Sequence, residues 1–207
     1  TTYASTDTSG NGVSAGSSVT RYVYDPAGRL LQSIDGKGAT TAYAYDGLGR
    51  LVSTTDGLGQ LATMVYDDEG ARIVAQAANG LRETRMYDRA GRLVSSQRSD
   101  AASADLGTTH FFYDALGRLR ASQDASGATS WTLYDEAGRK SAEVGASGSL
   151  REYVYNGSGQ VTRVIAYATP VDVRLLTAAD GSPADVAVAT LRPSAAPADR
   201  SDWTVYD

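Results

Sequence analysis

The chain has 207 residues, no cysteine, and a net charge of −5 that comes from 19 basic and 24 acidic side chains. This acidic balance argues against a nucleic-acid or anionic-lipid partner, and the lack of cysteine excludes disulfides, thiolate metal sites and a cysteine nucleophile. No run of apolar residues is long enough to form a membrane-spanning helix. We also expect this chain to bind no cofactor.

Residues 1–19 are predicted to form a partial repeat followed by a long loop, because residues 2–10 align with residues 52–59 of a later repeat. From residue 20 to residue 161 the phrase Tyr-Asp-x-x-Gly-Arg-Leu recurs in seven copies of varying quality, which indicates a repeat architecture. The copies begin at Tyr24, Tyr45, Tyr66, Tyr87, Tyr113, Tyr134 and Tyr155. Successive tyrosines are 21 residues apart, except for 26 residues between the fourth and the fifth.

The phrase from Tyr45 to Leu51 predicts a tight β-hairpin. Asp46 can accept hydrogen bonds from the backbone of its own turn, and Gly49 can adopt the left-handed conformation that closes a three-residue loop. This register places Tyr45 opposite Leu51 and Asp46 opposite Arg50, so the two pairs are expected on opposite faces of the sheet. We expect the face with the Tyr and Leu side chains to be the buried one.

A second kind of turn joins each hairpin to the next. Gly-rich sequences such as Asp56-Gly57 lie between motif copies and are followed by β-prone residues. Each strand is therefore predicted to be joined to the next by a hairpin turn. The resulting fold is all-β, an antiparallel meander of 21-residue repeats. About fourteen strands exceed the usual size of a flat open sheet, so we expect a curved or spiralling sheet.

Three places depart from the period. In the third copy Ala71 and Arg72 stand where Arg and Leu are usual, so this hairpin is expected to lack both pairs and to be bulged or exposed. Residues 98–107 include five extra residues and are predicted to form a surface loop. Residues 162–203 are predicted to be an irregular Pro/Ala-rich insertion that packs on the sheet as a plug or flap, and residues 204–207 to begin a further repeat.

The phrase, its spacing and its Gly-rich turns resemble the YD repeats of the RHS (rearrangement hotspot) family, which includes bacterial polymorphic toxins, insecticidal toxin-complex shells, wall-associated proteins and the animal teneurins. The resemblance implies a long β-sheet that spirals into a hollow shell, often around a C-terminal toxin or other cargo. The family's self-cleaving, shell-closing motif is not matched. Asp25-Pro26-Ala27-Gly28 resembles part of that motif but lies in an ordinary repeat, where we predict a turn.

Candidate catalytic residues are few. His110 is the only histidine and is predicted to be an ordinary strand residue rather than part of a triad or a metal site. The acidic run Asp67-Asp68-Glu69 could clamp a metal, but the register favours a solvated hairpin tip. We therefore expect no catalytic residue and no metal ligand in this chain.

Tyrosine is unusually abundant, with 13 residues. Tyr22, Tyr43 and Tyr153 each precede a motif copy by two residues and are weak candidates for a glycan-binding surface, since sugar rings pack on aromatic faces. The alternative is that the tyrosines form the hydrophobic spine of the sheet, and their regular recurrence favours this interpretation.

The predicted function is structural: a wall of a β-shell that encapsulates or helps deliver a toxin or effector, within a large secreted or cell-surface protein. The expected partners are further repeats of the same protein and an enclosed effector domain. Two alternatives stay open. One is a carbohydrate-binding or adhesive surface protein with a glycan partner, and the other is a self-assembling extracellular fibre.

Overall fold

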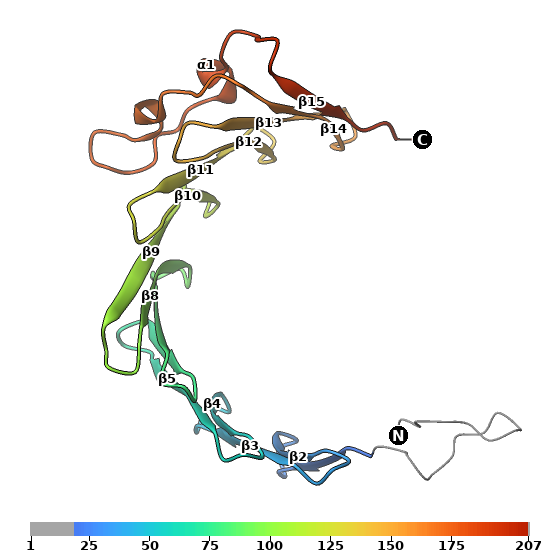
Figure 1. Cartoon of the computed structure of the whole chain (residues 1–207), viewed down its shortest axis with the longest axis vertical. Coiled ribbons are helices and arrows are strands. Elements are labelled where there is room, and N and C mark those ends of the chain that lie inside the picture. The colour runs from blue at the N-terminus through green and yellow to red at the C-terminus, as the bar shows by residue number, and fades with distance from the viewer. Residues whose placement is uncertain (1–18, 207) are drawn as a thin grey trace, which may run out of the picture. The chain divides into compact units, whose positions relative to one another are not determined.

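The computed structural model describes residues 19–206 of the chain, which form fifteen β-strands and two short helices (Figure 1). The elements are β1 (Arg21–Tyr24), β2 (Leu30–Ile34), β3 (Thr40–Tyr45), β4 (Leu51–Thr55), β5 (Leu61–Asp67), β6 (Arg72–Gln76), β7 (Arg82–Tyr87), β8 (Leu93–Ser99), β9 (Asp105–Tyr113), β10 (Leu119–Gln123), β11 (Thr129–Tyr134), β12 (Lys140–Val144), β13 (Leu150–Tyr155), β14 (Val161–Ala166), the 3-10 helix η1 (Val173–Leu176), α1 (Val188–Leu191) and β15 (Arg200–Trp203). Strand order in the sheet follows the sequence. The predicted all-β antiparallel meander is therefore confirmed. Residues 1–18, which carry most of the predicted partial repeat, are outside the described residues.

The chain divides into two units. The first comprises Thr1–Met86 and Gln97–Leu106, and the second comprises Tyr87–Ser96 and Gly107–Asp207. Each unit contains several copies of the hairpin, and the pairings within each are antiparallel. The curvature expected for the whole sheet stays a prediction.

The hairpin turns have the geometry that the motif predicts. Asp46 Oδ1 accepts hydrogen bonds from the backbone N–H groups of Leu48 and Arg50, both at 2.9 Å, and the φ angle of Gly49 is +79°. Tyr45 pairs with Leu51, after which the register shifts by one residue, as in a β-bulge. The equivalent glycines of four other motif copies also have positive φ, namely Gly28, Gly91, Gly117 and Gly138.

The third hairpin differs from its prediction. Its loop is one residue longer, so Tyr66 pairs with Ile73 and Asp67 pairs with Arg72 in an unbroken register. Ala71 ends the loop with a φ of +46°, and Arg72 forms an ion pair with Asp67 at 3.2 Å. The expected loss of both cross-strand pairs is therefore wrong, because the longer loop moves each partner by one position and restores an aromatic–aliphatic pair and an ion pair.

The extra residues of the fourth repeat lengthen a hairpin. β8 runs to Ser99 and β9 begins at Asp105, so only residues 100–104 form the turn. Asp100 Oδ1 accepts hydrogen bonds from the N–H groups of Ala102 and Ala104, at 2.9 and 2.8 Å. The region 98–107 predicted as a surface loop is thus partly strand, because the Asp at the start of the turn supplies the hydrogen bonds that close it.

The buried residues of the described chain lie in the second unit. Its hydrophobic core contains Ala121, Trp131, Leu133, Ala142, Val144, Leu150, Leu176 and Leu191. Leu133 pairs with Ala142 and directly precedes Tyr134 in β11, so the core occupies the face opposite to that of the motif tyrosine. The prediction that the Tyr and Leu face is buried is therefore wrong in this unit, where Leu119 keeps 36% of its surface exposed.

Residues 167–199, which we call the flap, cover this face (Figure 1). Helix η1 contributes Leu176 and helix α1 contributes Leu191, both buried against the core, so the prediction that the insertion packs on the sheet is confirmed. β14 pairs with β15, which makes residues 162–166 and 200–203 strand within the segment 162–203 predicted to be irregular. No helix within residues 19–206 has the length and apolar character needed to cross a membrane.

Candidate functional site

A ladder of Asp, Arg and Tyr side chains joins consecutive hairpins. In each rung the motif Asp binds the Arg of its own hairpin, and that Arg lies over the ring of the next Tyr of the ladder. Five rungs are present in the described residues: Asp25–Arg29–Tyr45, Asp46–Arg50–Tyr66, Asp88–Arg92–Tyr113, Asp114–Arg118–Tyr134 and Asp135–Arg139–Tyr155. The guanidinium carbons lie between 4.2 and 5.2 Å from the ring centroids, which is within the range of a cation–π interaction.

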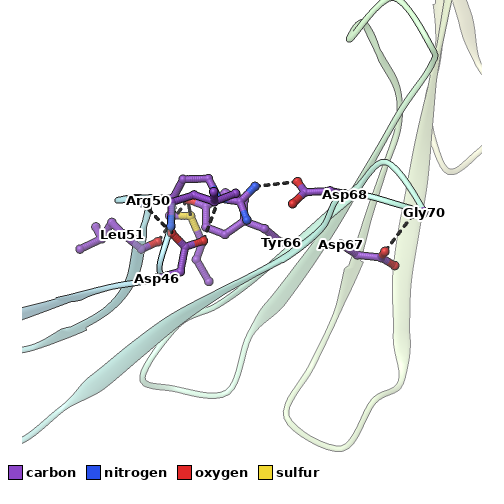
Figure 2. A network of polar contacts seen from close by, with 9 residues as sticks. Asp46, Arg50, Leu51, Tyr66, Asp67, Asp68 and Gly70 are labelled. Carbon is purple, nitrogen blue, oxygen red and sulfur yellow. Dashed lines mark hydrogen bonds and ion pairs between the residues drawn. The ribbon is translucent and has the colours of Figure 1, made fainter.

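Figure 2 shows the rung that contains Arg50. Its Nε donates to Asp46 Oδ2 at 2.8 Å, and its guanidinium carbon lies 4.2 Å from the centroid of the Tyr66 ring. The Tyr66 hydroxyl donates to the carbonyl of Leu51 at 3.1 Å, which ties the ring to the hairpin that carries the arginine. Asp68 accepts a further hydrogen bond from Arg50 Nη1 at 2.6 Å. Side chains of one hairpin therefore hold the next hairpin at several points.

The tyrosine hydroxyl makes the same kind of backbone hydrogen bond in the other rungs. Tyr45 donates to the carbonyl of Leu30 at 2.9 Å, Tyr113 to Leu93 at 2.8 Å, Tyr134 to Leu119 at 3.0 Å and Tyr155 to Lys140 at 2.7 Å. Tyr206, in the segment predicted to begin a further repeat, donates to the carbonyl of Val161 at 2.9 Å. The ladder tyrosine thus offers its ring to an arginine and its hydroxyl to the backbone.

The ladder corrects the prediction that the ion pair and the aromatic pair occupy opposite faces. The Arg118 guanidinium reaches Tyr134 at 4.4 Å while its Nε stays on Asp114 at 2.6 Å. Asp114 Oδ1 accepts from the backbone N–H of Arg118, which leaves Oδ2 free to orient the guanidinium of this long side chain. Pairs within a single hairpin do not reveal this contact, because it joins two hairpins. The regular spacing between each Arg and the next Tyr was the available signal.

The hydrogen bonds of each rung favour its charged form. The backbone N–H of Arg50, followed by its guanidinium, lowers the pKa of Asp46 below the ordinary value. Burial would raise the pKa of Asp114, but hydrogen bonds from the backbone and side chain of Arg118 outweigh burial and lower it. Hydrogen bonds to Asp68 and Asp46 raise the pKa of Arg50. At neutral pH each rung is therefore an ion pair stacked on an aromatic ring.

A second polar cluster holds the flap on the sheet. Glu152 of β13, with 6% of its side chain exposed, accepts hydrogen bonds from Arg192 Nε at 3.0 Å, from Arg192 Nη2 at 2.5 Å and from the Tyr167 hydroxyl at 2.6 Å. Burial acts to raise the pKa of Glu152, yet these hydrogen bonds lower it below the ordinary value. Sequence reasoning missed this cluster, because its partners are up to 40 residues apart and no motif marks them.

The three tyrosines proposed for glycan binding lie in different surroundings. Tyr22 is 56% exposed, and its ring centroid lies 6.5 Å from that of Tyr24. Tyr43 is half-buried, and Tyr153 is half-buried with its hydroxyl donating to Glu143 Oε2 at 2.8 Å. Tyr22 is therefore the most exposed aromatic surface of the three, and glycan binding stays a prediction.

The structure also shows the surroundings of the residues considered for catalysis or metal binding. His110 is an exposed residue of β9. Asp67 is paired with Arg72, and Asp68 is paired with Arg50, so the acidic run at this hairpin tip serves the turn and the ladder. Within residues 19–206, no three His, Cys, Asp or Glu side chains are grouped so that they could hold a metal ion.

The RHS Repeat family matches the chain at residues 24–61 and at residues 113–150. Each match spans two copies of the motif and one complete rung, Arg29 with Tyr45 in the first and Arg118 with Tyr134 in the second. No curated protein matches the chain.

Three solved structures have a similar fold. The chain is similar to a TcdB2-TccC3-Cdc42 structure (TM-score 0.62, 18% identity, 72% of this chain), to a TcdB2-TccC3-TEV structure (TM-score 0.61, 17% identity, 72% of this chain) and to a Photorhabdus luminescens Tc holotoxin pore (TM-score 0.60, 18% identity, 73% of this chain). It spans 9% of the length of each of those chains, and at this identity the likeness shows the fold alone. The chain is therefore an all-β array of hairpins, and two of its stretches match the RHS Repeat family.

Proposed function

We propose that this chain is a stretch of the wall of an RHS-type shell that encloses a polypeptide cargo, such as a toxin or effector domain, in a secreted or surface-exposed protein. The ladder carries the proposal, because each rung fastens one hairpin to the next and lets the sheet extend repeat by repeat as a single layer. In the first unit this layer forms without a single buried residue among those described. A layer that needs no core beneath it suits the wall of a container.

The similar structures support the toxin context of this proposal. They include TcdB2-TccC3 complexes and a Tc holotoxin pore. The polar side chains of the repeats also support a structural role, since Asp46, Arg50 and Asp68 bind one another. Charged groups engaged in this way hold one hairpin to the next, as the wall of a shell requires.

Limited proteolysis of the longest natural polypeptide that contains this sequence tests the proposal. We expect a segment outside the repeats to resist protease while the wall is intact, and electron microscopy to show a hollow particle. The substitution Arg118→Asp removes a rung and places a carboxylate beside Asp114, so it should expose the protected segment. The matched control is Arg89→Asp at the exposed tip of a hairpin turn in the same unit, which should leave the protection unchanged.

The same experiments distinguish the alternatives. A protein digested throughout at one rate, without hollow particles, would refute the shell. Saccharide binding that is lost in Tyr22→Ala would favour an adhesive surface, and filaments that lengthen with protein concentration would favour a fibre.

A further inference from the structure

We infer that a pocket between β10 and the flap binds a small oxyanion, a carboxylate or a phosphate group, through the side chain of Arg120. The pocket has a volume of about 390 Å³ and lies between the turn that joins β9 to β10 and residues 182–185 of the flap. The charged side chains that line it are Asp114, Arg118, Arg120 and Asp185. All of them belong to the second unit.

Arg120 is a buried cation without a carboxylate at hydrogen-bonding distance. Its side chain is 6% exposed, and its Nη2 donates to the carbonyl of Ala184 at 2.7 Å. The carboxylate oxygen paired with it, Asp185 Oδ1, is 3.7 Å away and belongs to a side chain that is fully exposed. Burying a charge costs free energy unless a well-placed partner compensates it, so this guanidinium favours an anion in the pocket.

The neighbouring charged side chains do not compensate the buried charge of Arg120. Arg118 binds Asp114 at 2.6 Å and stacks on Tyr134, so this ion pair is complete within the ladder. The positive charge that remains in the pocket therefore belongs to Arg120. Among the described residues that line the pocket, the distant Asp185 is the one carboxylate left to compete with an anion for this charge.

Arg120 also has hydrogen-bond donors left for a ligand. A guanidinium carries five N–H donors in a planar fork that matches the oxygens of carboxylates and phosphates. One nitrogen of this fork, Nη2, donates to the carbonyl of Ala184, and Arg120 lines the pocket, so the rest of its fork is the source of donors for a ligand there. A small oxyanion in the pocket can bind this fork directly.

Titration of the whole chain with inorganic phosphate and, separately, with acetate at pH 7 and low salt tests the inference. We expect saturable binding by calorimetry and a rise in Tm for at least one of the two anions, and the tighter one identifies the preferred group. Arg120→Gln should weaken binding by at least about tenfold, because a charge-assisted bidentate contact is lost. Arg89→Gln, the matched control at an exposed arginine, should change the affinity by less than about twofold.

Asp185→Asn is the decisive variant, because it leaves the bond between Arg120 and Ala184 in place. Removing the competing carboxylate should tighten anion binding by about threefold or more. The inference is overturned if neither anion binds saturably, if Arg120→Gln folds and binds as the unmodified chain does, or if Asp185→Asn leaves the affinity unchanged. Should Arg120→Gln fail to fold, the Asp185→Asn result decides alone.

Discussion

The two units are built from the same hairpin, yet only the second has buried residues among those described. Leu133, directly before the motif Tyr134, is 1% exposed, while Val65, at the same place before Tyr66, is 59% exposed. Leu133 lies in one buried cluster with Leu176 and Leu191 of the flap, whereas no described residue of the first unit is buried. The motif therefore makes the hairpin and the ladder, while residues outside the motif decide whether a face acquires a core.

The largest expected effect is the loss of a core side chain. Leu133→Ala should reduce the free energy of unfolding of the second unit by about 3 kcal/mol, because it removes transfer energy and leaves a cavity. Val65→Ala, the matched change in the first unit, should alter stability by less than about 0.5 kcal/mol, since the side chain is largely exposed. Hydrogen exchange of β11 and of β5 measures the two effects, and equal losses would contradict the difference between the units.

The next effect concerns the flap. Arg192→Met leaves the buried Glu152 carboxylate without its cation and should destabilise the second unit by about 2 kcal/mol, less than for a fully buried pair because Arg192 is half exposed. Arg174→Met is the control, since the Arg174 side chain is 88% exposed and its ion pair with Asp172 is on the surface. Urea unfolding monitored by Trp fluorescence should separate the two variants.

The same cluster makes the second unit sensitive to acid. The pKa of Glu152 is lowered in the folded chain, so its contribution to stability is present above the unfolded value, near 4.5, and is lost as the pH falls through the lower folded value. Unfolding measured from pH 7 to pH 3 should show a steeper loss of stability in the unmodified chain than in Glu152→Gln. Parallel curves would show that Glu152 has no such role.

Turn strain should affect both units alike. Gly49→Val and Gly138→Val each force a β-branched residue into a positive φ and should each cost at least about 1 kcal/mol. The costs should agree to within about 0.5 kcal/mol, because the strain is local to the turn. Gly47→Val, in the same turn as Gly49 but without a positive φ, is the control. A much larger cost in one unit would show that the turn depends on its surroundings.

The smallest effect is expected in the ladder. Tyr45→Phe in the first unit and Tyr134→Phe in the second each remove a hydrogen bond to a backbone carbonyl, worth about 0.5–1 kcal/mol, and keep a ring for the arginine. The two losses should be similar, since the ladder is the same in both units. Thermal unfolding of each variant measures them, and a loss confined to the second unit would mean that the ladder depends on the flap.

Sequence reasoning succeeded where the contacts are local and failed where they are not. It predicted the pairing of Tyr45 with Leu51 and the positive φ of Gly49, which depend on residues within a few positions of the turn. It missed the contact of Arg50 with Tyr66, since that contact joins two hairpins and needs the conformation of a long side chain. It also missed the shift in the third hairpin, because one added loop residue changes every partner.

The repeating hairpin follows from local sequence alone, because Asp46 and Gly49 close their turn through hydrogen bonds and backbone angles that need no distant partner. The buried face, and the cluster of Glu152, Arg192 and Tyr167 that holds the flap on the sheet, depend on tertiary contacts. Leu176 and Leu191 belong to the same buried cluster as Leu133 although they lie more than forty residues further along the chain, and such packing depends on where the chain returns in space. A motif specifies the geometry of its own turn, whereas burial depends on what covers it.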